Sequence, residues 1–244
     1  MVADTIEVHR ADSRFRTRSE GTDTRHSFSF GTHYDPGNVG FGSLLVHNDD
    51  RVRSGSGYPD HPHTDAEILT WVLEGSLVHA DSTGCRGLIV PGLAQRLSAG
   101  AGVVHAERND AFRDDPSAPV LPVRFVQMWL RPDTPGTPPA YAARPVDLDD
   151  LAADWRPVAS GDNPDAAVSV SSRGATLWAT RLAAGVSRLL PAGPLTHVFV
   201  AIGEVEVETV GPLVEGDALR LSEGAQLRLT GVSAAEVLVW TMAP

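Results

Sequence analysis

Short runs of alternating or continuous apolar residues recur along the chain, separated by clusters of Gly, Pro, Asn and Asp. Such runs are typical of β-strands, and short strands at close spacing are typical of a barrel or a sandwich. The first half predicts strands at 42–47, 67–73, 76–81, 86–90, 95–97, 103–107 and 123–130. The second half predicts strands at 167–171, 176–182, 197–201, 204–210, 217–221, 225–229 and 236–242. The pattern therefore indicates an all-β fold.

The run at 123–130 differs from the others because both of its faces are rather apolar. One face carries Val123, Phe125, Gln127 and Trp129, and the other carries Arg124, Val126, Met128 and Leu130. Alternate residues of a strand point to opposite sides of its sheet, so both sides need cover here. The pattern predicts a central strand rather than an edge strand.

A Pro-rich segment at 132–165 separates the two sets of strands. Proline at this density opposes both helix and central strand, so the segment is expected to be a connector. Its acidic stretch at 147–154 is expected to form a short helix. A chain of 244 residues can build two modest β domains, each with its own core. We therefore predict two tandem antiparallel, jelly-roll-like β-barrels, at 1–131 and 166–244.

Charge and composition limit the classes of partner. A net charge of −11 argues against binding of a nucleic-acid backbone, which needs a clustered basic surface. No apolar run approaches the ~20 residues of a membrane span, and the first residues do not resemble a signal peptide. Cys85 is the only cysteine, so no intrachain disulfide is expected. We expect a cytoplasmic protein.

Two couples of polar residues stand out, His61-Pro-His63 and His105-Ala-Glu107. Side chains at positions i and i+2 of a strand share one face, about 6.6 Å apart. One His-x-His couple is weak evidence, because paired histidines also occur as ordinary core or surface residues. Two couples on neighbouring strands can converge, and they then offer three imidazoles and one carboxylate. Such a set predicts a divalent first-row metal with positions left open for water or substrate.

The second half has a single histidine, His197. One imidazole cannot chelate a metal, so we expect His197 to be a hydrogen-bonded strand residue and the second barrel to be metal-free. His26, His33 and His47 are expected to be surface or packing residues. The stretch from His79 and Asp81 to Gly84 is interpreted first as turn chemistry.

Further motifs accompany the two couples. In chain order they are His26-Ser-Phe-Ser-Phe30, Tyr34-Asp-Pro36, Gly40-Phe41, His79-Ala-Asp-Ser-Thr-Gly84 and Gly100-Ala-Gly102. Together with the couples they resemble the hallmarks of the pirin family, within the cupin superfamily. The similarity is dense from about residue 5 to residue 131 and weaker beyond.

The resemblance implies a bicupin, with a metal barrel followed by a metal-free barrel. It implies that His61, His63, His105 and Glu107 hold one metal, with Glu107 rather than Glu67 as the carboxylate ligand. Iron is expected first, and nickel, copper, manganese, cobalt or zinc would also suit these ligands. Glu67 occupies the usual cupin carboxylate position, and it is expected to orient an imidazole or to act as a pocket acid.

The chain is similar to bacterial pirin-like proteins assigned quercetin 2,3-dioxygenase activity. This similarity implies cleavage of quercetin or a related flavonol by O2, with loss of carbon monoxide. The reaction needs a general base for the flavonol proton, for which Glu107 is the first candidate and Glu67 the second.

Two other classes of function fit the same residues. One is a metal-dependent regulator that binds partner proteins, as the resemblance to pirins also implies. The other is a non-oxidative cupin enzyme, an isomerase or a lyase, that uses its metal as a Lewis acid. Aerobic turnover with release of carbon monoxide would separate the dioxygenase from both.

Overall fold

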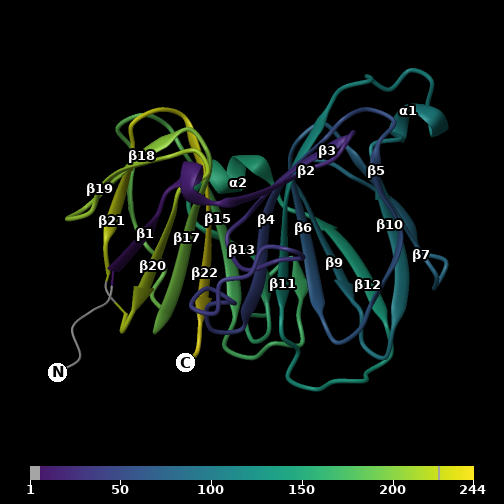
Figure 1. Ribbon diagram of the computed structural model, residues 1–244. Helices are drawn as coiled ribbons and strands as arrows, with labels where there is room; N and C mark the ends of the chain where they lie inside the picture. Colours follow the sequence, from purple (N-terminus) through teal and green to yellow (C-terminus); the bar gives the residue numbers. More distant parts are fainter. Residues whose placement is uncertain (1–5, 225) are drawn as a thin grey trace.

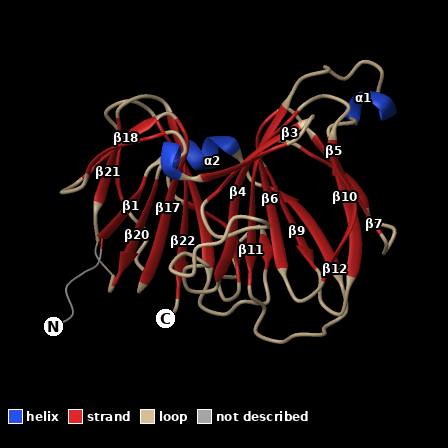
Figure 2. Ribbon diagram, in the orientation of Figure 1, coloured by secondary structure: helices blue, strands red, loops and turns tan. Residues whose placement is uncertain are grey.

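Two barrels of β-strands lie side by side in the computed structural model, which describes residues 6–224 and 226–244 (Figure 1). Helices are few and short (Figure 2), so the all-β prediction is confirmed. Within the described residues, no helix has the length and apolar character needed to cross a membrane.

In chain order, the strands up to residue 145 are β1 (Ile6–His9), β2 (Phe15–Arg18), β3 (Thr22–His26), β4 (Leu44–Val52), β5 (Gly57–His63), β6 (Glu67–Glu74), β7 (Leu77–Asp81), β8 (Arg86–Ile89), β9 (Leu93–Ser98), β10 (Val103–Arg108), β11 (Val123–Leu130) and β12 (Ala140–Pro145). The remaining strands are β13 (Arg156–Ser160), β14 (Val168–Ser169), β15 (Thr176–Leu182), β16 (Ser187–Leu189), β17 (Leu195–Ile202), β18 (Glu204–Val207), β19 (Gly211–Val214), β20 (Ala218–Ser222), β21 (Arg228–Gly231) and β22 (Ala235–Met242). The helices are the 3-10 turn η1 (Ala11–Ser13), α1 (Ala111–Asp114) and α2 (Leu148–Ala153).

Each predicted strand overlaps an observed one, although Ala225, at the start of the run expected at 225–229, lies outside the described residues. The expected helix is α2. It forms because the Asp147 side chain accepts a hydrogen bond from the Asp149 N–H at 2.9 Å, which caps the first turn.

Each barrel combines a seven-stranded and a four-stranded sheet. In the first barrel the orders are β12-β9-β6-β11-β4-β3-β2 and β5-β10-β7-β8. In the second they are β1-β20-β17-β22-β15-β13-β14 and β16-β21-β18-β19. Strand pairing within the described residues is antiparallel except for the short pair β13 and β14. As predicted, β11 is a central strand, between β6 and β4.

The chain crosses between the barrels more than once. Strand β1 pairs with β20 of the second barrel, and Figure 1 shows it in purple among the green and yellow strands. The segment at 132–165 carries β12, an edge strand of the first barrel, and β13, which pairs with β15 of the second. The domain boundaries at 131 and 166 stay a prediction. The strand pairings show in addition that β1 and the segment at 132–165 connect the two barrels.

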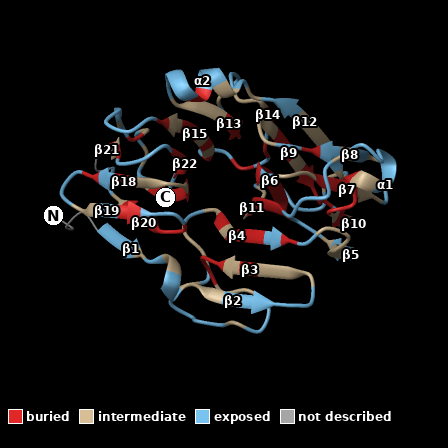
Figure 3. Ribbon diagram, turned by 90° about the horizontal axis from the view of Figure 1, so that it is seen from above, coloured by how far each residue is buried: buried red, intermediate tan, exposed pale blue. Residues whose placement is uncertain are grey.

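The largest apolar core lies between the barrels, where the two seven-stranded sheets face each other. Figure 3 shows the buried residues gathered along these facing strands. From β11, Val126, Met128 and Leu130 enter this core, and Trp240 of β22 joins it from the other side. The Trp71 Nε1–H donates a 2.7 Å hydrogen bond to Glu236 across the interface. This packing holds the seven-stranded sheets of the two barrels together.

The two barrel interiors differ in chemistry. The second barrel is filled by one apolar cluster, which includes Val198 and Val200 of β17. His197 lies on the opposite face of β17, in the inter-barrel layer, with its ring centroid 5.0 Å from that of His47. Neither ring nitrogen of His197 has a hydrogen-bond partner among the described residues, so the expectation of a hydrogen-bonded residue is wrong. His47 is a packing residue.

The first barrel holds two separate apolar clusters instead of one. One cluster includes Val52, Val72 and Phe125, and the other includes Ile68 and Leu97. A band of polar side chains on the same inward faces lies between these clusters. The interior of the first barrel therefore carries polar groups, whereas the described core of the second barrel is apolar.

Candidate metal centre

The two histidine couples meet inside the first barrel. Strands β5 and β10 are antiparallel neighbours, and His61 lies opposite His105 while His63 lies opposite Val103. The ring centroids are 4.7 Å apart for His61 and His63, 4.5 Å for His61 and His105, and 4.9 Å for His63 and His105. One nitrogen from each ring lies within 4.8 Å of the other two. The spacing in the sequence thus brings three imidazoles to one point.

A β-bulge in β5 shifts the register between β5 and β10 next to these histidines. Glu107 pairs with Tyr58 rather than with Pro59, so β5 carries one extra residue between its pairs with His105 and Glu107. Strand β5 is an edge strand, where proline costs no ladder hydrogen bond. At the end of the bulge Gly57 has a φ of 154°, and a Cβ there would lie 2.3 Å from the Glu107 carbonyl oxygen. Only glycine allows this close contact.

Each of these imidazoles has a ring nitrogen that can act as a metal ligand. The His61 Nδ1–H donates to the Pro59 carbonyl at 2.7 Å, which leaves its Nε2 with a lone pair. Burial and, to a smaller extent, the neighbouring imidazoles lower the pKa of His63 to about 4 and that of His105 to about 3. Among the described residues, His63 Nε2 and both nitrogens of His105 have no hydrogen-bond partner. These residues fit a divalent metal.

Glu107 lies beside the imidazoles but is held by other groups. Its Oε2 accepts from Gln127 Nε2 at 2.6 Å, and its Oε1 accepts from Thr70 Oγ1 at 3.2 Å. Burial raises the pKa of Glu107 to about 7, although both hydrogen bonds oppose the rise. Glu107 is not part of the group formed by His61, His63 and His105, and it groups instead with His105 and His79.

His79 is the residue that sequence reasoning missed. Strand β7 borders β10 on the side away from β5, and it places His79 opposite Glu107 and Asp81 opposite His105. The His79 ring is fully buried, and its Nε2 lies 3.0 Å from Asp81 Oδ2. Asp81 also accepts from the Thr83 N–H, so the turn interpretation was right but incomplete. The i, i+2 spacing of His79 and Asp81, the same as in the other couples, was the available signal.

A cavity of about 340 Å³ opens onto this centre. Its lining residues are Thr17, Thr22, Thr24, His26, Phe30, Asn48, Asp50, Tyr58, Pro59, His61, His63, Glu107, Gln127 and Trp129. Asp50 is a second buried acid in this wall, and its Oδ1 accepts 2.6 Å hydrogen bonds from Thr24 and Tyr58. Burial raises the pKa of Asp50 to about 6. The cavity thus combines aromatic walls with two protonatable carboxylates.

Glu67 lies elsewhere. Its carboxylate is buried and accepts from Ser98 Oγ at 2.9 Å. On β6, residues 67, 69 and 71 share one face, and Leu69 and Trp71 belong to the inter-barrel core. Thr70 lies on the opposite face and contacts Glu107 inside the barrel. Glu67 is not one of the residues that line the cavity.

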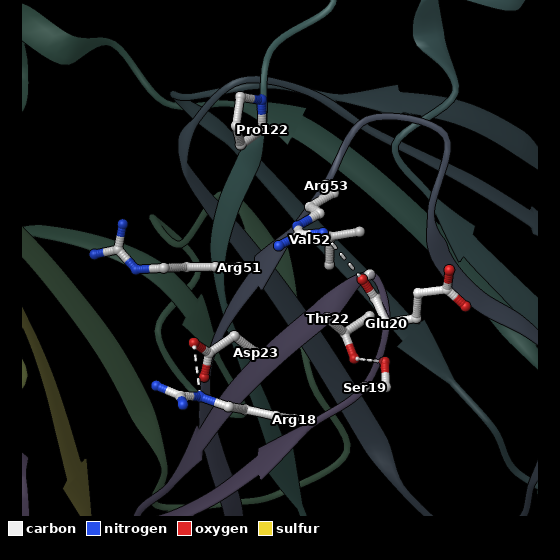
Figure 4. A pocket seen from close by; sticks show the side chains of 10 residues that line it. Arg18, Ser19, Glu20, Thr22, Asp23, Arg51, Val52, Arg53 and Pro122 are labelled. Atoms are coloured by element: carbon white, nitrogen blue, oxygen red, sulfur yellow. Dashed lines mark hydrogen bonds and ion pairs between the residues drawn. The ribbon is translucent and has the colours of Figure 1, made fainter.

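A separate pocket of about 400 Å³ lies at the rim of the first barrel (Figure 4). It presents three arginines, Arg18, Arg51 and Arg53, and Figure 4 shows Arg18 close to Asp23. This pocket shares only Thr22 with the histidine-lined cavity, and none of its described lining residues is a histidine. It is therefore not part of the histidine centre.

Comparison with known proteins supports the fold and the family. A Mycobacterium tuberculosis protein named "Putative quercetin 2,3-dioxygenase" is 44% identical over 239 residues, which span 98% of this chain and 95% of that protein. The Escherichia coli K12 protein named "Quercetin 2,3-dioxygenase" is 37% identical over 142 residues, or 58% of each chain. The crystal structure of the Escherichia coli bacterial pirin YhhW in complex with nickel(II) is 28% identical with a TM-score of 0.87, covering 98% of this chain and 100% of that one.

The structural match confirms the bicupin fold implied by the sequence motifs. The sequence model described as Pirin matches residues 8–130, a range that contains both histidine couples. With identity also extending over nearly the whole length of a relative, the chain belongs to the pirin family.

Proposed function

We propose that this chain is a metal-dependent dioxygenase that cleaves quercetin or a related flavonol with O2. The observation that carries the proposal is the convergence of three imidazoles, two of which line an aromatic-walled cavity. The names of the relatives supply the substrate class, since the geometry alone favours any small chelating aromatic molecule.

His61, His63 and His105 would hold the metal through their free nitrogens, and Glu107 would complete the set when its carboxylate leaves Gln127 and Thr70. We propose iron as the resident metal, with nickel as the first alternative because a relative was crystallised with nickel(II). When bound, a redox-active divalent metal supplies Lewis acidity toward the flavonol oxygens and one-electron chemistry with O2.

The walls of the cavity would orient the substrate. Trp129 and Phe30 pack edge to face with ring centroids 5.6 Å apart, and Trp129 also meets the His63 ring at 4.7 Å. These rings give the flat flavonol an apolar surface beside the imidazoles. A volume of about 340 Å³ lies at the lower end of the range for small-molecule sites, so a flavonol would displace most of the water.

Glu107 would take the proton of the flavonol 3-hydroxyl. A base works best when its pKa lies near the working pH, and burial raises the pKa of Glu107 to about 7. While the carboxylate is away from the metal, Gln127 and Thr70 would hold it beside the substrate. Asp50, with Thr24 and Tyr58, would stabilise the polar edge of the substrate across the cavity.

Elemental analysis of protein purified without added metal, paired with an aerobic quercetin assay, tests the proposal. Iron, nickel, copper, manganese or cobalt together with turnover would support the dioxygenase. Zinc without turnover would favour the Lewis-acid enzyme or the regulator. A full complement of redox-active metal that leaves quercetin unchanged under air would overturn the proposal.

A further inference from the structure

His79 contacts the metal centre but has no role in the ligand set proposed above. Its ring is fully buried, and its centroid lies 5.4 Å from that of His105. One ring nitrogen of His79, one of His105 and one carboxylate oxygen of Glu107 all lie within 4.8 Å of one another. Two ligand atoms on one metal are about 3.0–3.4 Å apart, so small side-chain shifts would bring these three atoms to coordinating distance.

The environment of His79 gives it the chemical form of a ligand. Its Nε2 donates to Asp81 Oδ2 at 3.0 Å, because the hydrogen bonds from Thr83 and Cys85 hold Asp81 as a carboxylate, which can only accept. When the ring is neutral its lone pair then lies on Nδ1, and this atom has no partner among the described residues. A histidine that gives one N–H to a carboxylate and keeps the other nitrogen free is the usual arrangement of a metal ligand.

We propose that His79, His105 and Glu107 form a second, inner position for the divalent metal, in which His79 takes the place of His61 and His63. The inference rests on the proposed metal binding at this centre. His105 and Glu107 are common to both positions, so one metal occupies either position at a time. Within the sheet, β10 lies between β5, which supplies the outer histidines, and β7, which supplies His79. The two positions therefore lie toward different neighbours of β10.

The two positions differ in access. His61 and His63 are partly exposed and line the cavity, so a metal in the outer position meets the substrate. His79, His105 and Glu107 are all buried, and neither His79 nor His105 lines the cavity. Of the inner ligands, Glu107 alone lines the cavity, so a metal in the inner position is less accessible to the substrate than a metal in the outer position.

Cobalt(II) binding to a set of variants tests the inner position. The double variant His61→Ala/His63→Ala keeps the inner ligands, so it is expected to bind one equivalent of cobalt with an affinity reduced roughly 10- to 100-fold. Adding His79→Ala leaves one imidazole and one carboxylate, and binding should fall by at least a further tenfold or so. Adding His33→Ala instead is the matched control, because His33 belongs to neither histidine group, and binding should not change.

His79→Ala alone gives a test in a nearly wild-type protein. The outer position remains intact, so the variant should still bind one equivalent of cobalt within about threefold of the wild-type affinity. Circular dichroism of each metal-free variant checks the fold. A folded double variant that binds no cobalt, a triple variant that binds as well as the double, or loss of cobalt from His79→Ala alone would each overturn the inner position. None of these readouts uses flavonol turnover, so failure of the dioxygenase proposal is observed separately.

Discussion

Gln127 Nε2 donates a 2.6 Å hydrogen bond to Oε2 of Glu107 inside the first barrel. The Trp129 Nε1–H donates to Gln127 Oε1 at 3.0 Å, which fixes the amide so that its NH₂ group faces the carboxylate. The hydrogen bond lowers the pKa of Glu107 while burial raises it to about 7. Gln127 thereby sets how much of this carboxylate is ionised near neutral pH.

Replacing Gln127 with Leu should shift the pH dependence of flavonol cleavage. Without the amide the pKa of Glu107 rises further, so the acid limb of the kcat/KM profile should move to higher pH. A shift of about one unit would lower turnover at neutral pH by up to roughly tenfold. The metal content should remain at the wild-type level. The profile should be measured from pH 5 to 9, and an unmoved acid limb would contradict the role assigned to this hydrogen bond.

Glu107→Gln and Glu67→Gln separate the two candidate bases. The Glu107 variant should lose at least about a hundredfold in kcat with little change in flavonol binding, because an amide cannot accept the proton. The Glu67 variant should keep kcat within roughly threefold, since Glu67 lies on the inter-barrel face of β6. Rapid-mixing measurements of flavonol binding and turnover give both quantities. The reverse pattern would make Glu67 the base.

The metal-free protein should show a pH-dependent stability that depends on Glu107. The unfolded carboxyl has a pKa near 4.5, and the folded one is raised to about 7. Between these values the folded state holds a proton that the unfolded state has released, so the free energy of unfolding falls as the pH rises. The loss has an upper limit of about 3 kcal/mol.

Glu107→Gln removes this dependence. His63 and His105, whose pKa values are lowered by burial, oppose the trend but are present in both proteins, so their effect cancels in the comparison. Urea unfolding with a chelator, at pH 5 to 8, should show the wild type losing stability relative to the variant. A difference that stays constant over this range would contradict the raised pKa.

Substitution of Trp71 tests how much its hydrogen bond to Glu236, which joins the two barrels, contributes to stability. Its indole N–H donates to Glu236, a buried carboxylate that Arg181 also contacts at 2.7 Å. Trp71→Phe should reduce the free energy of unfolding by about 2–4 kcal/mol, through the lost hydrogen bond and a cavity in the inter-barrel core. Trp155→Phe is the matched control, because its indole N–H donates at an exposed site, and it should cost less than about 1 kcal/mol. Equal losses in urea unfolding would show that Trp71 makes no special contribution.

The sequence predicts what depends on short-range patterns. The alternation at 123–130 correctly indicates a central strand, because each face of β11 packs against a different apolar core. The i, i+2 spacing of His61, His63 and His105 leads to their convergence, because β5 and β10 are antiparallel neighbours. In both cases strand geometry alone decides which side chains share a face.

Long-range pairing was out of reach for the same reasoning. Nothing near Ile6–His9 indicates that β1 pairs with β20, a strand more than two hundred residues away. The place of His79 depends on β7 lying next to β10, and the turn chemistry of Asp81 drew attention from it. Glu67 follows His63 by four residues, but the chain turns between β5 and β6. Glu67 therefore lies on the inter-barrel face of its sheet, whereas Thr70 lies on the face toward the barrel interior.

Carbon monoxide release as a function of metal occupancy tests the proposed function most directly. Metal-free protein should be loaded with increasing amounts of iron(II), and separately with nickel(II), and mixed with quercetin in air. The proposal predicts one carbon monoxide per quercetin consumed, a rate that rises in proportion to bound metal up to one per chain, and no rate in His105→Ala, which removes a ligand of the centre. Quercetin loss that does not depend on bound metal, or a fully loaded protein that releases no carbon monoxide, would contradict it.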